Sequence, residues 1–255
     1  MVLYRFMEKL RYFAFFVCFY GEVSAMSTEC DSLITISVER TVHKEGFHRE
    51  VVSQVSWYHD DPKDGDCSLL FLHYIPREMF VDLDEINRSN LTNAKVLPLG
   101  DKKNFDVERP AHLSTAQTVL VYSNIKKQIQ HRSEGKHWQL TSDTMLPVHW
   151  RYQKPSDNQH YITVSLPQPT LMVLCRDSFS SGHMQECFNQ LEKAQYPCNY
   201  NTMEMCEWVV LKQKQDNGND IIFTVPVGVK KHSILVASGT IFVTLSASYI
   251  LIWLP

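Results

Sequence analysis

The sequence is poor in glycine and proline and carries little net charge. It has 9 glycines and 11 prolines among 255 residues, which excludes collagen-like and low-complexity chains. Hydrophobic residues make up 44% of the chain and the formal charge is only −3, so it is too apolar to remain disordered. The basic excess that nucleic-acid binding requires is also missing, and we expect no nucleic-acid partner. These exclusions leave a globular protein of one domain or two small ones.

Motifs that would indicate catalysis or metal binding are equally scarce. The chain has no C-x-x-C, H-E-x-x-H or G-x-S-x-G string, and nothing selects one Ser/His/Asp triad among its many candidates. Asp82 and Asp84 match the D-x-D pair of many glycosyltransferases, but the pattern is short and the alternating strands and helices of nucleotide-sugar enzymes are absent. The acidic segment 60–66 lacks EF-hand spacing and favours a solvated hairpin loop over a weak calcium site. We therefore predict no catalytic residue, no cofactor and no metal site.

The N-terminus has the pattern of a signal peptide. Three basic residues up to Arg11 precede a short apolar run over residues 12–20. As a helix this run would measure about 13 Å, less than half of a bilayer core of about 30 Å. Small or tolerated residues at 23–25 follow it, as a cleavage site requires. We predict a signal peptide over residues 1–25.

The C-terminus has the pattern of a membrane-spanning helix. Residues 234–254 carry no charge and would extend about 31 Å as a helix, close to the thickness of one bilayer core. We predict a transmembrane helix over residues 232–254, with residue 255 as a residual tail. Small residues would let another helix approach the span closely. They are Ala237, Ser238, Gly239 and Ser246.

Two sequence signals disagree about the orientation of this span. Lys230 and Lys231 precede it, and the positive-inside rule would place them in the cytosol. A cleaved signal peptide would place them in the lumen of the secretory pathway. We favour the signal peptide, because a translocating chain stops at the next apolar segment despite modest flanking charge. This predicts a type I protein with residues 26–231 in the lumen.

Cysteines and glycosylation sequons favour the same compartment. Six cysteines remain after the predicted cleavage, and an even number in a secretory chain predicts disulfides without fixing how they pair. The last four lie close together, so we expect a locally stapled lobe. Sequons predict N-glycosylation at Asn87 and Asn90, which are too close for us to expect both to be occupied. The candidate disulfide cysteines are Cys30, Cys67, Cys175, Cys187, Cys198 and Cys206.

The periodicity between the two ends is mostly that of β-strands. About nine short alternating or apolar runs are separated by turn residues, which predicts a mainly β protein with an antiparallel β-sandwich. Helical turns are predicted only at 82–87 and 184–194, and the polar, basic stretch 124–142 is expected to form an exposed loop or hairpin tip. The predicted strands are 33–38, 51–57, 67–74, 118–122, 146–152, 161–166, 171–175, 207–211 and 221–225.

The strand at 146–152 has an unusual composition. Val148, Trp150 and Tyr152 alternate with His149, Arg151 and Gln153, which predicts one apolar face and one face with a His–Arg pair. The ordinary interpretation is a half-buried strand. The alternative is that His149 and Arg151 contact a partner protein.

Seven segments of the chain carry a joint pattern: 46–49, 75–86, 104–114, 146–152, 171–175, 206–208 and 223–228. Together they resemble the PIG-X/PBN family. The resemblance implies a single-pass endoplasmic reticulum membrane protein, lumenal in its bulk and without catalysis of its own. It further implies a partner, a membrane-embedded polytopic catalytic subunit like PIG-M, which moves the first mannose from dolichol-phosphate-mannose to the glycosylphosphatidylinositol (GPI) precursor. On this hypothesis His149, Arg151 and Gly239 are candidate partner contacts.

The alternative function is a cell-surface β-sandwich receptor or adhesion ectodomain, either single-pass or GPI-anchored. A GPI-attachment site near Gly218 would be followed by an apolar tail. The polar spacer between that site and the tail, which begins at Ile234, is however longer than the usual length of about 8–12 residues. A surface receptor also usually carries a cytosolic tail after its span. The resemblance itself leads us to expect a short cytosolic tail, whereas the sequence ends at Pro255.

Overall fold

The structure, a computed structural model, describes most of the chain beyond the predicted signal peptide. Cys30, the acidic segment 60–66, Asn90 and the region around Gly218 lie outside the described residues. The described residues are 35–59, 67–88, 94–100, 105–132, 135–175, 182–213 and 220–253.

The first sheet has the strand order β13-β1-β2-β8-β4. A sixth strand, β7, also pairs with β8 but is not part of this linear order. All its pairings are antiparallel except that of β1 with β13. Alternation places Val51, Val55 and Trp57 on the buried face of β2, as their spacing of two or four residues predicts. The strands are β1 (Thr35–His43), β2 (His48–His59), β4 (Met79–Phe80), β7 (Lys126–Arg132), β8 (Gly135–Trp150) and β13 (Lys212–Gln213).

The second sheet has the order β11-β12-β10-β3-β6-β5 and is antiparallel throughout. Its central strand β3 reads as a continuous apolar run because both faces are covered: Phe71 faces one cluster of buried side chains and Leu70 the other. The strands are β3 (Cys67–Ile75), β5 (Ala94–Leu99), β6 (Gln117–Asn124), β10 (Thr170–Cys175), β11 (Lys193–Pro197) and β12 (Met205–Val210).

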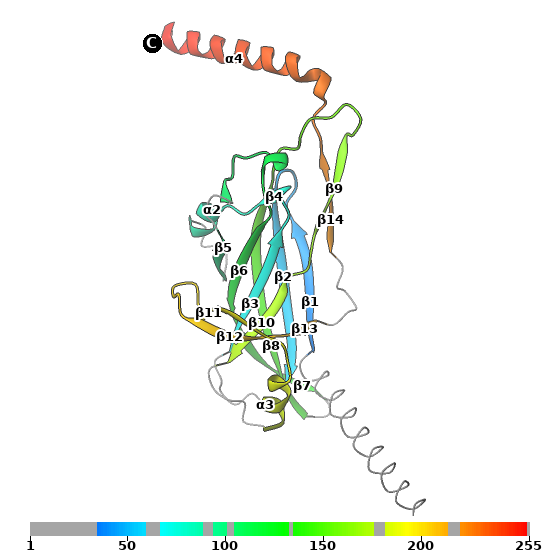
Figure 1. Ribbon diagram of the computed structural model, residues 1–255, viewed down its shortest axis with the longest axis vertical. Helices are drawn as coiled ribbons and strands as arrows, with labels where there is room; N and C mark the ends of the chain where they lie inside the picture. The colour runs from blue at the N-terminus through cyan, green and yellow to red at the C-terminus, as the bar shows by residue number, and fades with distance from the viewer. Residues whose placement is uncertain are drawn as a thin grey trace, which may run out of the picture.

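The two sheets pack face to face around the main core. This core joins Val51 and Val148 of the first sheet to Phe71, Val121 and other inward residues of the second. The arrangement confirms the predicted mainly β, antiparallel sandwich. Figure 1 shows the sandwich as the long body of the molecule.

A second apolar cluster lies on the outer face of the second sheet. Trp208 of β12 is fully buried there and meets Tyr122 of β6 with ring centroids 6.0 Å apart. The Tyr122 hydroxyl donates to the Pro197 carbonyl at 3.0 Å, which ties the β11–β12 hairpin to the sheet. The hairpin thus covers a sheet face that would otherwise be exposed.

Disulfides fasten both sheet and hairpin. Cys67 joins Cys175, its direct neighbour in the β3–β10 register, across 108 residues of sequence. Cys198 joins Cys206 and closes the β11–β12 hairpin. Cys187 of α3 (Gly182–Asn189) is also disulfide-bonded. The expected local stapling therefore holds for the hairpin, whereas Cys175 is linked to a distant strand.

A third, two-stranded ribbon leads to the C-terminal helix. It pairs β9 (Tyr161–Leu166) with β14 (Ile221–Pro226) and continues through the 3₁₀ turn η4 (Lys230–His232) into α4 (Ser233–Trp253). The span Lys230–Trp253 is long and apolar enough to cross a membrane, and none of its residues is buried within the molecule. Figure 1 shows α4 beyond one end of the sandwich.

One local prediction is confirmed in its hairpin form, and another differs from the structure. The stretch 124–142 forms the β7–β8 hairpin, because β8 continues its pairing with β2 as far as Trp138. The helix expected over 184–194 ends at Asn189, since Lys193 and the residues after it pair with β12 as β11. Tertiary pairing overrides local propensity in both places. The short turn predicted at 82–87 is α2 (Leu83–Arg88).

Candidate functional site

Segments that are distant in the sequence meet at the end of the sandwich nearest α4 (Figure 1). Backbone hydrogen bonds run from Trp150 to the Phe47 carbonyl and from Arg151 to the Glu78 carbonyl, both at 2.9 Å. The Ala111 amide donates to the Tyr152 carbonyl at 3.0 Å. We call this region the α4-proximal end. It comprises residues 44–50, 76–88, 105–114 and 147–152.

Arg151 lies inside this region rather than on its surface. Only 2% of the residue is exposed. Its Nη1 donates to the carbonyls of Asp106 at 2.6 Å and Arg109 at 2.9 Å, and its guanidinium carbon lies 4.9 Å from the centre of the Phe80 ring. Burial lowers the pKa of Arg151, while the Asp106 carboxylate opposes that shift. The geometry makes Arg151 an anchor for the segment 105–114, because its charged group is covered and cannot reach a partner directly.

His149 is partly exposed and belongs to a polar cluster. Its Nε2 lies 2.7 Å from Glu85 Oε2, and its ring stacks on Phe80 with centroids 5.0 Å apart. The His48 ring meets it edge-on at 4.5 Å. The predicted alternation is therefore correct for Val148 and Trp150, which are buried, but wrong for Tyr152, which lies beyond the end of β8 and is exposed. The His–Arg face is covered by α2 and the segment 105–114.

Asp82 fixes the position of the helix that carries Glu85. Its Oδ1 accepts the amide hydrogens of Asp84 at 2.9 Å and Glu85 at 3.2 Å, which caps the N-terminus of α2. The carboxylate that begins the D-x-D pattern is thus used as a helix cap. Asn87, a predicted glycosylation site, is exposed on the same helix.

Apolar side chains are exposed at the α4-proximal end. The Phe47 and Tyr152 rings lie 5.4 Å apart, and Tyr152 is 76% exposed. Leu113, on the 3₁₀ turn η2 (Ala111–Leu113), is 62% exposed. Exposed aromatic and aliphatic groups of this kind are typical of surfaces that meet a partner or the membrane interface.

The four small residues of the predicted span do not all lie on one face of helix α4. Successive residues of a helix are about 100° apart, so Gly239 shares a face with Ser246 but not with Ala237. A different face carries Thr240 and Thr244, about 100° and 140° around the helix from Gly239, and their hydroxyls donate to helix carbonyls four residues earlier. A Cβ added at Gly239 would meet no atom within 4 Å, so this position is open to a neighbouring helix.

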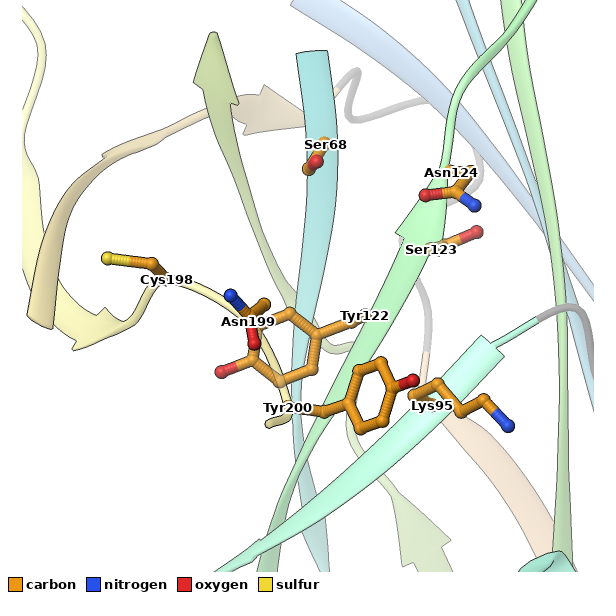
Figure 2. Close-up of a pocket in the computed structure, with 8 residues that line it drawn as sticks. All are labelled: Ser68, Lys95, Tyr122, Ser123, Asn124, Cys198, Asn199 and Tyr200. Carbon is orange, nitrogen blue, oxygen red and sulfur yellow. The ribbon is translucent and has the colours of Figure 1, made fainter. Parts of the chain in front are cut away.

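A cavity of about 370 Å³ lies between the tip of the β11–β12 hairpin and strands β3, β5 and β6 (Figure 2). Burial raises the pKa of Tyr122, on its wall, to about 12, so the phenol stays protonated and donates to Pro197. Lys95 lies 5.7 Å from the centre of the Tyr200 ring. We assign no chemistry to this cavity. Its lining residues are Ser68, Lys95, Tyr122, Ser123, Asn124, Cys198, Asn199 and Tyr200.

Sequence reasoning missed the cluster of His48, Glu85 and His149. The three residues are far apart in the chain and match no ligand-spacing motif. Only the register of β2 with β8, which sets His48 opposite His149, brings the imidazoles together. No signal in a single sequence reveals that register.

Comparison with known proteins identifies the family. The PIG-X / PBN1 family model matches residues 44–254. A mouse protein named "GPI alpha-1,4-mannosyltransferase I, stabilizing subunit" is 30% identical over 212 residues, covering 82% of this chain and 76% of its own length. The human protein of that name is 29% identical over 220 residues, covering 85% and 78%. Protein pbn1 of Schizosaccharomyces pombe is 29% identical over 116 residues, covering 45% and 33%. The resemblance inferred from the sequence is confirmed, and the chain belongs to the PIG-X / PBN1 family.

Proposed function

We propose that this chain is a non-catalytic, stabilising subunit of GPI mannosyltransferase I in the endoplasmic reticulum membrane. It would support the transfer of the first mannose from dolichol-phosphate-mannose to the GPI precursor. The observation that carries this proposal is similarity over most of both chains to mammalian proteins named as the stabilising subunit of that enzyme. The family match supports this function and gives no support to the alternative of a cell-surface receptor.

The proposal includes a topology. One candidate span near the C-terminus and a disulfide-bonded β-sandwich suit a type I protein whose bulk lies in the oxidising lumen. The exposed Asn87 would then be accessible to glycosylation. If Asn87 carries a glycan, endoglycosidase H should remove it from a protein that resides in the endoplasmic reticulum. The glycans of a surface receptor would instead become resistant to this enzyme.

The proposed partner is a polytopic catalytic subunit similar to PIG-M. We propose contacts through α4, whose Gly239 face is open, and through the exposed side chains of the α4-proximal end. A helix without buried residues gains van der Waals contacts when it packs on the helices of a membrane enzyme. The partly exposed His149 stays a candidate contact, while Arg151 would act indirectly by holding the segment 105–114.

The experiment that tests the function is lipid mass spectrometry of GPI precursors in cells that lack this protein. We expect the glucosaminyl-acyl precursor without mannose to accumulate, the catalytic subunit to decline, and both effects to reverse when the chain is expressed again. Re-expression of the sandwich with an unrelated span is the matched control for the contribution of α4. A normal precursor profile in the deleted cells would contradict the proposed function.

A further inference from the structure

Three side chains at the α4-proximal end converge with the geometry of metal ligands. One nitrogen each from His48 and His149 and a carboxylate oxygen of Glu85 all lie within 4.8 Å of one another. His149 Nε2 is 2.7 Å from Glu85 Oε2, and His48 Nδ1 is 3.7 Å from Glu85 Oε1. The second distance is too long for a hydrogen bond, so the His48 nitrogen faces the carboxylate without bonding to it.

The backbone holds all three groups in place. His48 and His149 are direct cross-strand neighbours in the β2–β8 pairing, and their side chains lie on the same face of that sheet. Glu85 approaches from α2, whose first turn is capped by Asp82. The Phe80 ring stacks on His149 and limits its rotation. Ligands carried by paired strands and a capped helix are positioned before any ion arrives.

A further carboxylate stands behind His48. Glu50 Oε1 lies 3.9 Å from His48 Nε2, the nitrogen on the far side of the ring from Glu85. This distance is too long for a hydrogen bond, and His48 Nε2 instead accepts from the Lys44 ammonium at 3.4 Å, because lysine can only donate. Lys44 also pairs with Glu50 at 2.6 Å, and its side chain is 51% exposed. Metal-bound histidines usually donate their other ring hydrogen to a carboxylate or carbonyl, so in the zinc-bound state Glu50 would replace Lys44 as the partner of Nε2.

We propose that His48, Glu85 and His149 bind one Zn²⁺ ion. Two imidazole nitrogens and one carboxylate oxygen form a typical zinc set, with bonds of about 2.0–2.2 Å, whereas Ca²⁺ and Mg²⁺ prefer oxygen alone. Ligands of one zinc ion lie about 3.3 Å apart, so binding requires the 2.7 Å His149–Glu85 contact to open and the longer separations in the cluster, all within 4.8 Å, to close. The partial exposure of all three side chains leaves the fourth position to water.

Zinc at this position would link α2 to the first sheet. It would fix the surface formed by α2 and the nearby β1–β2 turn, at the end of the sandwich closest to α4. The inference depends only on the geometry of this chain and stands or falls independently of the proposed enzyme complex.

The test uses the full chain, purified in detergent through a tag without histidine and stripped with a chelator. Zinc content is measured after equilibration with ZnCl₂, and affinity by competition with a chromophoric chelator. The variants are Glu85→Gln, the double variant His48→Ala/His149→Ala, and the control His160→Ala, which removes an exposed histidine outside the cluster. Thermal melting is recorded with and without zinc, because an ion that binds only the folded state raises Tm.

We expect one zinc per chain in the unaltered protein and in His160→Ala, with a rise in Tm for both. Glu85→Gln should lower the affinity for zinc by about tenfold or more, and the double variant should lower it by about 100-fold or more. Glu85→Gln preserves side-chain size, so it decides the matter if the double variant fails to fold. The proposal is overturned if the unaltered chain binds no zinc, or if Glu85→Gln binds it as tightly and gains the same Tm.

Discussion

Arg151 shows how one buried cation can organise a segment of irregular backbone. Its guanidinium donates to two carbonyls of the segment 105–114 and lies over the Phe80 ring. Replacement by alanine would leave both carbonyls without their charged donor. We expect Arg151→Ala to lower the free energy of unfolding by about 2–4 kcal/mol, since hydrogen bonds to charged groups contribute about 1.5–3 kcal/mol each and do not add fully. Thermal melting followed by circular dichroism measures the loss.

Arg109→Ala is the matched control for this prediction. Its side chain is 55% exposed and pairs with Asp106 at 3.4 Å, so its loss should cost less than about 1 kcal/mol. Its backbone carbonyl remains available to Arg151 in the variant. Equal destabilisation by the two substitutions would mean that the buried hydrogen bonds of Arg151 do not stabilise the fold.

His73 makes stability depend on pH. The residue is 2% exposed, and neither ring nitrogen has a hydrogen-bond partner among the described residues. Burial, with a smaller effect from Arg40, lowers its pKa from 6.5 to about 3. Below pH 6.5 His73 therefore binds a proton in the unfolded chain, whereas in the folded chain it stays neutral until about pH 3. We expect this residue to remove about 1.4 kcal/mol of stability per unit of falling pH within that window.

His73→Leu isolates this effect. The free energy of unfolding of both proteins is measured by denaturation between about pH 4 and 7. The carboxylates are the same in both proteins, so their contributions cancel when one pH dependence is subtracted from the other. The variant should lose stability less steeply toward acid, and should be at least as stable at neutral pH because two unpaired buried nitrogens are removed. Identical slopes for the two proteins would show that His73 is protonated in the folded state as readily as in the unfolded state.

At the scale of elements, the sequence predicts strands well where alternation or apolar runs are strong. Runs such as 161–166 and 221–225 coincide with β9 and β14 to within a residue. The two-residue strand β4 and the mostly half-exposed β5 have no such pattern and could not be found. The polar β7 forms because β8 supplies a partner, which no local signal records. The candidate site could not be predicted for the same reason: Glu85 and His149 meet only through tertiary packing, which leaves no local signal in the sequence.

The two disulfides whose partners are described should differ in their contribution to stability. Cys67–Cys175 closes a loop of 108 residues and Cys198–Cys206 one of 8. In the chain-entropy model these loops correspond to about 4.8 and about 2.5 kcal/mol, respectively. We therefore expect Cys67→Ala/Cys175→Ala to lower the unfolding free energy more than Cys198→Ala/Cys206→Ala. The reverse order would indicate that packing of the hairpin on Tyr122, rather than loop entropy, decides the contribution.

The whole molecule combines a sandwich with a helix that has no buried residue. Segments that carry the family resemblance, including 46–49, 75–86 and 146–152, gather at the end of the sandwich near that helix (Figure 1). A partner in the membrane can therefore meet both parts at once. Two modest contacts on one chain reinforce each other when the connection between them is short.

Which face of α4 would meet the proposed partner can be decided by two leucine substitutions. Gly239→Leu adds a whole side chain on one face, and Thr244→Leu makes a smaller addition about 140° around the helix, where the hydroxyls bond to the helix itself. Leucine is a good helix former and lipid-compatible, and a Cβ added at position 239 meets no atom within 4 Å, so neither variant should lose its fold or its insertion. Gly239→Leu should weaken the complex by about 1–2 kcal/mol through lost close packing, seen as reduced co-purification and a lower level of the catalytic subunit. Thr244→Leu should leave both unchanged. The opposite result would place the partner on the hydroxyl face, and two unaffected variants would move the contact from α4 to the exposed side chains of the α4-proximal end.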